Sequence, residues 1–177
     1  MNNDQPLAYF DTWTVYGTHL QGAATGWRKH GKGDMRPEPL MEAWRADRLK
    51  HPIRLLDGEC RAIVESMIGK HCLFRSWHLW VANARSNHVH VVVTANSHRG
   101  DIVRDQLKAN STKALREHNE IFRDRPVWSV GGDWRCVNTE DELQRVVEYV
   151  RDAQDRKFLE YPDTGTGRKY PDTGTGR

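Results

Sequence analysis

The sequence predicts an α+β fold, namely a ferredoxin-like (RRM-like) antiparallel sheet with helices on one face and a C-terminal helix that carries a tyrosine. Two observations support this prediction. Runs rich in β-branched and aromatic residues alternate with stretches of helical periodicity, in the order β-α-β-β-α-β-β-α. The densest β run, at residues 88–94, follows another predicted strand after a tight turn.

Composition predicts one mildly basic domain. The chain has 177 residues, 37% hydrophobic content and a formal net charge of +3, which permits a nucleic-acid partner without requiring one. We expect a domain at residues 1–159 and a disordered tail at 160–177, where YPDTGTGR occurs twice. There is no long apolar run, no signal-peptide pattern and no Cys-x-x-Cys spacing. We therefore expect a cytoplasmic monomer or homodimer without a membrane partner.

The chain opens with a predicted strand and a predicted loop. Residues 8–16 are rich in aromatic and β-branched residues, which favours a strand. Residues 22–52 have no apolar periodicity and carry several glycines, prolines and charges, which predicts a long loop. Within it Arg28 and Lys29 are candidate DNA-binding cations, and a merely solvated loop is the alternative interpretation.

A helix and a second strand follow. Residues 56–69 have apolar residues at helical spacing, with Asp57 as the predicted N-cap and Gly69 at the predicted end. Residues 73–82 alternate as a strand, and residues 83–87 form a tight turn into the next strand.

Residues 99–118 predict a second helix, and its polar side carries Lys108 and Lys113 as further candidate DNA-binding residues. A solvated helix face is the alternative interpretation. Residues 126–137 predict a hairpin around a Gly-Gly turn.

The last predicted helix spans residues 140–158. Thr139 and Glu142 form a capping box at its start. Leucine and valine residues at helical spacing form a buried stripe. Tyr149 lies at the flank of that stripe, about 100° from its centre, where a tyrosine can pack its ring and keep its hydroxyl exposed. A purely structural tyrosine is the alternative interpretation.

His88 and His90 are separated by one valine in the densest strand, so both imidazoles lie on the same face of the sheet. Two adjacent imidazoles on a rigid strand form half of a metal site. A surface strand that happens to carry two histidines is the alternative.

Three segments together resemble a known family. The first segment, LAYFDTWTVYGTHLQG, is similar to the first strand and turn of that family. The second segment, from Cys60 through SNHVHVVV, is similar to the family's helix, strand and Asn-His-x-His run. The third segment, VVEYVRDAQ, is similar to the family's tyrosine helix. The family is that of the REP-associated tyrosine transposases and the broader single-tyrosine HUH transposases of insertion sequences. HUH denotes histidine, hydrophobic residue, histidine. The resemblance runs from Leu7 to about Lys157.

The resemblance implies a transposase that cleaves and rejoins single-stranded or hairpin-forming DNA, and that is nucleoid-associated when bound to it. A tyrosine hydroxyl has a pKa of about 10 and is a poor nucleophile near neutral pH. Mg²⁺ or Mn²⁺ on His88 and His90 would therefore polarise the scissile phosphate for attack by Tyr149. The products would be a 5′-phosphotyrosine link and a free 3′-hydroxyl.

The third metal ligand departs from the family pattern. Related transposases have a glutamine four residues after the tyrosine, where this chain has Ala153, and Gln154 is the next residue. On a regular helix Gln154 points about 140° away from Tyr149. We expect Gln154 to be the ligand if the helix bends or ends near Asp152, which is an alternative oxygen ligand.

Other function classes remain open from sequence. A zinc-dependent hydrolase would combine the two histidines with Cys72, Cys136 or another histidine. A non-catalytic RRM-like RNA-binding module lacks the expected aromatic RNP run. A catalytically inactive, domesticated HUH protein is a further alternative.

Overall fold

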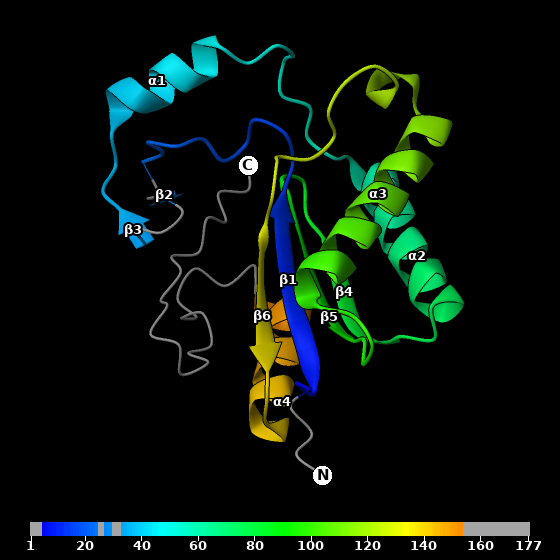
Figure 1. Cartoon of the computed structure of the whole chain (residues 1–177). Coiled ribbons are helices and arrows are strands. Elements are labelled where there is room, and N and C mark those ends of the chain that lie inside the picture. Colours follow the sequence, from blue (N-terminus) through cyan, green and yellow to red (C-terminus); the bar gives the residue numbers. More distant parts are fainter. Residues whose placement is uncertain (1–4, 25–26, 30–32, 154–177) are drawn as a thin grey trace.

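A computed structural model describes residues 5–24, 27–29 and 33–153 (Figure 1). Its main sheet contains four strands: β1 (Ala8–Thr14), β4 (His78–Ala84), β5 (His88–Thr94) and β6 (Asp133–Val137). Their order in the sheet is β4-β5-β1-β6, and every neighbouring pair is antiparallel. Helices α2 (Gly58–Phe74) and α3 (Gly100–His118) connect β1 to β4 and β5 to β6. This β-α-β-β-α-β order confirms the predicted ferredoxin-like α+β fold.

The two faces of the sheet pack against different helices because side chains alternate along each strand. On one face Trp13 and Val91 pack with α2 and α3. On the other face Phe10 and Val92 pack with α4 (Glu140–Glu148). Figure 1 shows α2 and α3 on one side of the sheet and α4 on the other. The C-terminal helix α4 therefore packs on the face of the sheet opposite α2 and α3.

Helix α4 begins at its predicted cap and changes helical type at Tyr149. The Thr139 hydroxyl accepts a hydrogen bond from the Glu142 backbone N–H at 3.2 Å. After Glu148 the chain continues as a π-helical turn, η2 (Tyr149–Ala153), in which backbone hydrogen bonds span five residues. Asn83 Nδ2 of β4 donates to the Val150 carbonyl at 3.0 Å, which ties this turn to the sheet.

Some predictions fall outside the described residues, namely the continuation of the last helix to residue 158, Gln154 and the tail at 160–177. Across the described ranges, no helix is both long and apolar enough to span a membrane.

The prediction of a long loop at residues 22–52 was wrong. Strands β2 (Trp27–Lys29) and β3 (Gly33–Met35) pair antiparallel, and helix α1 (Pro39–Asp47) follows them. None of the residues of α1 is buried. The helix therefore lacks the apolar stripe that reveals a helix in a sequence.

The predicted end of the first main helix was also wrong. Asp57 caps α2 as predicted, but the helix passes through Gly69 and continues to Phe74. A helical glycine costs about 1 kcal/mol relative to alanine, and the longer helix offsets this by burying Cys72. Strand β4 consequently begins at His78, later than predicted.

Residues 126–137 do not form the predicted hairpin. Both β-rich segments run along β1: Trp128 bridges to the residue that follows β1, and β6 pairs with β1 itself. Gly131 and Gly132 separate the segments and have φ values of 77° and 134°. A Cβ atom on Gly132 would lie 2.7 Å from the Thr12 carbonyl oxygen, closer than any side chain tolerates. The glycine pair therefore forms a bulge along β1 and not a reversal.

Asp11 is a fully buried carboxyl group on the face covered by α2 and α3. Neither of its oxygens has a hydrogen-bond partner among the described residues. Burial raises the pKa of Asp11 well above its ordinary value, and the attraction of Arg104 opposes this only in part. The folded protein thus holds the Asp11 proton more tightly than the unfolded chain does. Stability is therefore lost as the pH rises from about 4 through the folded pKa.

We expect Asp11→Asn to raise the free energy of unfolding near neutral pH by roughly 1–3 kcal/mol, because it removes the cost of keeping an ionisable carboxyl group buried without changing the size of the side chain. It should also reduce the loss of stability as the pH rises. Urea unfolding at a series of pH values measures both effects. Asp124→Asn makes the same change at an exposed position and should alter neither. An unchanged pH slope in Asp11→Asn would contradict this account.

Candidate active site

His88 and His90 lie side by side on β5, and their ring centroids are 4.7 Å apart. Both are on the face of the sheet that α4 covers. The Thr12 hydroxyl lies 2.8 Å from Nδ1 of His90, and the Asn87 side-chain oxygen lies 2.7 Å from Nδ1 of His88. An oxygen partner at Nδ1 is the usual means of orienting an imidazole that binds metal through its other nitrogen. Each imidazole is therefore oriented by an oxygen at its Nδ1.

His90 is 7% exposed. Burial lowers the pKa of His90 well below its ordinary value, and the charges of His88, Arg135 and Arg85 lower it further. His90 is therefore neutral at physiological pH, which is the state in which imidazole binds a metal ion.

Tyr149 approaches this pair from the end of α4. Its ring centroid is 6.0 Å from that of His90 and 6.5 Å from that of Phe10. The tyrosine is 8% exposed, so it lies deeper than its predicted position at the flank of the apolar stripe. Strand β5 and the last helix thus bring the three predicted catalytic residues together.

The described residues contribute two nitrogen donors to a possible metal site. Within residues 5–24, 27–29 and 33–153, no three His, Cys, Asp or Glu side chains are grouped so as to hold a metal ion. The alternative ligand Asp152 therefore does not join the two histidines. The regular helix ends at Glu148, so the angular offsets of a regular helix do not apply to η2. Gln154 lies outside the described residues.

The two cysteines considered as zinc ligands are on the other face of the sheet. Cys72 is buried in the core beneath α2. Cys136 on β6 lies opposite Tyr9 on β1 in the sheet, and the Tyr9 ring packs against that same core. Burial raises the pKa of Cys72 to about 11 and also raises the pKa of Cys136. The sheet separates both thiols from the histidines, and neither is disposed to form a thiolate.

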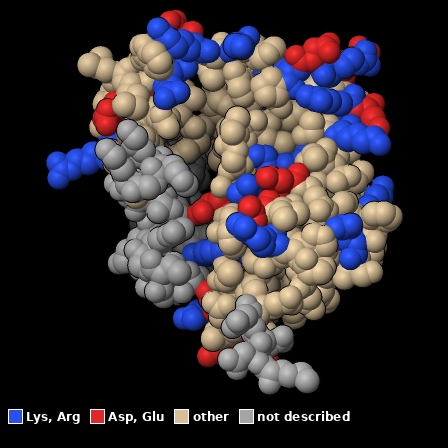
Figure 2. Space-filling model, viewed as in Figure 1, with Lys and Arg blue, Asp and Glu red and all other residues tan. Residues whose placement is uncertain are grey.

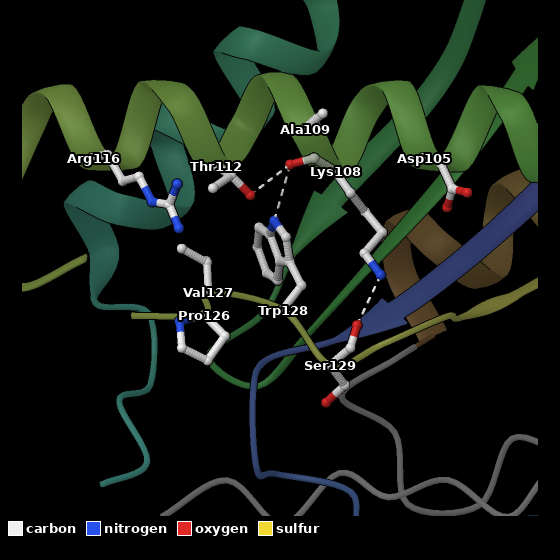
Figure 3. Close-up of a pocket in the computed structure, with 9 residues that line it drawn as sticks. All are labelled: Asp105, Lys108, Ala109, Thr112, Arg116, Pro126, Val127, Trp128 and Ser129. Carbon is white, nitrogen blue, oxygen red and sulfur yellow. Dashed lines mark hydrogen bonds between the residues drawn. The ribbon is translucent and has the colours of Figure 1, made fainter. Parts of the chain in front are cut away.

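The predicted cations Lys108 and Lys113 are on α3, behind the opposite face of the sheet. Nζ of Lys108 donates to the carbonyl of Ser129 at 2.8 Å (Figure 3), and it also donates to the carbonyl of Gly131. Burial lowers the pKa of Lys108. Lys113 is exposed, and its Nζ lies 3.9 Å from the carboxylate of Glu117. The structure therefore does not bring these lysines to the histidine face.

A surface depression of about 350 Å³ lies between α3 and residues 126–129. Figure 3 shows that Lys108 is the centre of the hydrogen bonds among the residues that line it. The Trp128 indole N–H and the Thr112 hydroxyl both donate to the Lys108 carbonyl, at 3.2 and 2.8 Å. The Trp128 contact and the bond from Lys108 Nζ to the Ser129 carbonyl hold the segment after α3 against the helix, so we assign the depression a structural role.

The remaining predicted cations, Arg28 and Lys29, are in β2, and their side chains lie outside what the structure describes. Sequence reasoning missed Arg135, a buried residue on β6 whose guanidinium carbon lies 4.8 Å from the Phe10 ring centroid. It also missed Thr12, the partner of His90. Alternation places Thr12 on the correct face, but only the register of β1 against β5 shows that it meets His90.

Tyr149, His88 and His90 are thus the predicted site residues that the structure brings together. No family model matches the chain, and no curated protein sequence matches it. The resemblance to the tyrosine transposases stays a prediction from the sequence.

Proposed function

We propose that the protein is a transposase-type single-stranded DNA endonuclease and strand transferase of the HUH kind. The observation that supports it most is the convergence of Tyr149 with His88 and His90 on one face of the sheet. Cleavage of a phosphodiester requires a nucleophile and neutralisation of charge on the phosphate. Tyr149 would supply the nucleophile, and the two imidazoles would supply ligands for a metal ion that neutralises the phosphate charge.

The residues present fit a divalent ion as far as the described chain extends. His90 is held neutral by burial, and both rings have an oxygen at Nδ1. With Gln154 as the proposed third ligand, His88 and His90 would hold Mg²⁺ or Mn²⁺, which imidazole and amide oxygen accommodate. The bound ion would withdraw charge from the scissile phosphate.

Tyr149 Oη would attack phosphorus, and the bond from phosphorus to the 3′ oxygen would break. The tyrosine proton would end on that 3′ oxygen, leaving a 5′-phosphotyrosine link and a free 3′-hydroxyl. Because the link retains the energy of the phosphodiester, attack by a later 3′-hydroxyl reverses the step without ATP. The Arg135 guanidinium lies over the Phe10 ring, which itself packs beside His90, so Arg135 would contribute positive charge near a phosphate bound at the histidines.

We expect Thr12→Val to weaken Mn²⁺ binding by roughly 10–100-fold, the usual effect of removing a partner that orients a metal-binding imidazole. Valine keeps the branched shape of threonine and removes the oxygen that contacts His90 Nδ1. Calorimetric titration with MnCl₂ measures the affinity. Thr94→Val makes the same change at the far end of β5 and should bind Mn²⁺ normally. Equal affinities for all three proteins would show that Thr12 does not orient a ligand.

The proposed function is tested with a pool of DNA hairpins whose single-stranded flanks are randomised. Incubation with the protein and Mn²⁺ should give a covalent adduct that survives SDS, and EDTA should prevent it. A fully paired duplex should give none, since its strands are not available to the site. Absence of any adduct from the pool, or cleavage undiminished by EDTA, would refute the proposal.

A further inference from the structure

The positive charge of this chain is concentrated in one segment, residues 27–54, which we name the basic arm. The basic arm contains eight of the 27 Lys and Arg residues of the chain and four of its 24 Asp and Glu residues. The rest of the chain therefore has nineteen Lys and Arg and twenty Asp and Glu. Figure 2 shows Lys and Arg side chains at the upper left of the molecule, where Figure 1 places α1, and others beside Asp and Glu along the rest of the upper edge. The remainder of the protein is close to neutral, so a polyanion is attracted to the arm.

The arm exposes an aromatic ring beside arginines. Trp44 is 50% exposed, and Leu40, one helical turn before it, is 89% exposed. The guanidinium carbon of Arg48 lies 3.8 Å from the Trp44 ring centroid, and that of Arg45 lies 5.4 Å away. Arg48 therefore covers part of the indole and keeps its own charge at the surface. A large aromatic ring flanked by cations suits a nucleobase with its phosphates.

The segments that lead into and out of the basic arm are both hydrogen-bonded to the turn before His88. On the entry side, the Thr18 hydroxyl donates to the Asn87 carbonyl at 3.2 Å. On the exit side, the Leu56 N–H donates to the Ser86 carbonyl at 2.8 Å. In Figure 1, α1, β2 and β3 accordingly lie beyond the end of β1, at the end of the sheet where β5 begins with the histidines.

The start of α1 also packs closely against Gly22, in the segment that leads from β1 to the basic arm. The Glu38 N–H donates to the Gly22 carbonyl at 3.0 Å. A Cβ atom on Gly22 would lie 2.5 Å from the Glu38 carbonyl oxygen, and φ of Gly22 is +97°. The backbones approach so closely that only glycine fits. Helix α1 is therefore held in place relative to the sheet.

We propose that helix α1 of the basic arm binds single-stranded DNA, with a base stacked on Trp44 and phosphates against Arg45 and Arg48. This deepens the proposed function and rests on it for the identity of the strand. A single strand is favoured over a duplex because its bases are free to stack. A second copy of the chain is disfavoured, since its arm would carry charge of the same sign.

The test measures binding without cleavage. A fluorescein-labelled oligothymidylate of about twelve nucleotides is titrated in EDTA and read by anisotropy. Trp44→Ala should weaken binding about tenfold, the value of one stacked base, and Trp44→Phe should restore most of the affinity. Phe74→Ala is the matched control, because Phe74 is an aromatic residue 81% exposed at the end of α2, and it should bind normally.

A second readout separates stacking from charge. Arg48→Gln should make the dependence of log K on log salt shallower by about 0.7, the loss of one phosphate contact on a single strand. Trp44→Ala should leave that slope unchanged while lowering affinity at every salt concentration. Unchanged melting temperatures show that the variants are folded, which is expected because no residue of α1 is buried.

Equal oligonucleotide affinity for Trp44→Ala and the unchanged protein would overturn the inference. It would also be overturned if Trp44→Ala changed the molar mass in light scattering, which would indicate a second copy as the occupant of this surface. If the proposed function alone were wrong, oligonucleotide binding would still depend on Trp44, but no hairpin would form a covalent adduct. An adduct formed with Trp44-independent binding would reject the arm and leave the cleavage proposal standing.

Discussion

Tyr149→Phe should form no SDS-resistant adduct with hairpin DNA and Mn²⁺, and should otherwise resemble the unchanged protein. The substitution removes only the attacking oxygen. It keeps the ring that packs against Phe10 and His90 at 6.5 and 6.0 Å, so unfolding and DNA affinity should be unaltered. Denaturing electrophoresis detects the adduct, and mass spectrometry of the digested protein locates the phosphate.

Two controls make this expectation specific. Tyr9→Phe removes a hydroxyl on the other face of the sheet and should leave the adduct intact. Truncation after Leu159 removes Tyr161 and Tyr170 and should also leave it intact. An adduct that persists in Tyr149→Phe would show that another residue is the nucleophile.

His88→Ala should lower the rate of cleavage by roughly 10²–10⁴-fold, because a metal ion contributes several kcal/mol of charge stabilisation at a phosphate. Much of the DNA affinity should remain, since contacts to phosphates elsewhere position the strand. Single-turnover cleavage and anisotropy measure the two quantities on the same protein.

His78→Ala is the matched control for this variant. His78 is an exposed histidine at the far end of β4, paired with Thr94 in the sheet, and its loss should leave the rate unchanged. Cleavage by His88→Ala at the rate of the unchanged protein would remove the metal role. Loss of DNA binding together with loss of cleavage would instead indicate that His88 acts in binding.

Local patterns were sufficient to predict which faces are buried. Period-two alternation in β5 predicted that His88 and His90 share a face, and they do. Helical spacing in the last helix predicted the valine stripe, and Val146 and Val150 are fully buried. The caps at Asp57 and Thr139 are also confirmed. Such features depend on neighbours within one turn or one strand, so a sequence contains the whole of the relevant information.

Features that depend on long-range contacts could not be predicted. The Gly131-Gly132 pair has the composition of a turn, yet the chain continues along β1 because its backbone passes close to Thr12. Gly69 has the character of a helix end, yet α2 continues because the extra turn buries Cys72. In both cases tertiary packing outweighs a local preference of about 1 kcal/mol.

By itself, the sequence determined the strand that carries His88 and His90 and the helix that carries Tyr149. Alternation and helical period assign each side chain to a face of its own element. Tertiary structure alone decided what those faces meet: the register that sets Thr12 against His90, the π turn at Tyr149, and the sheet that separates the cysteines from the site. The reason is that a periodic pattern indicates which side of a helix or strand is buried, but it does not identify the element that packs against that side.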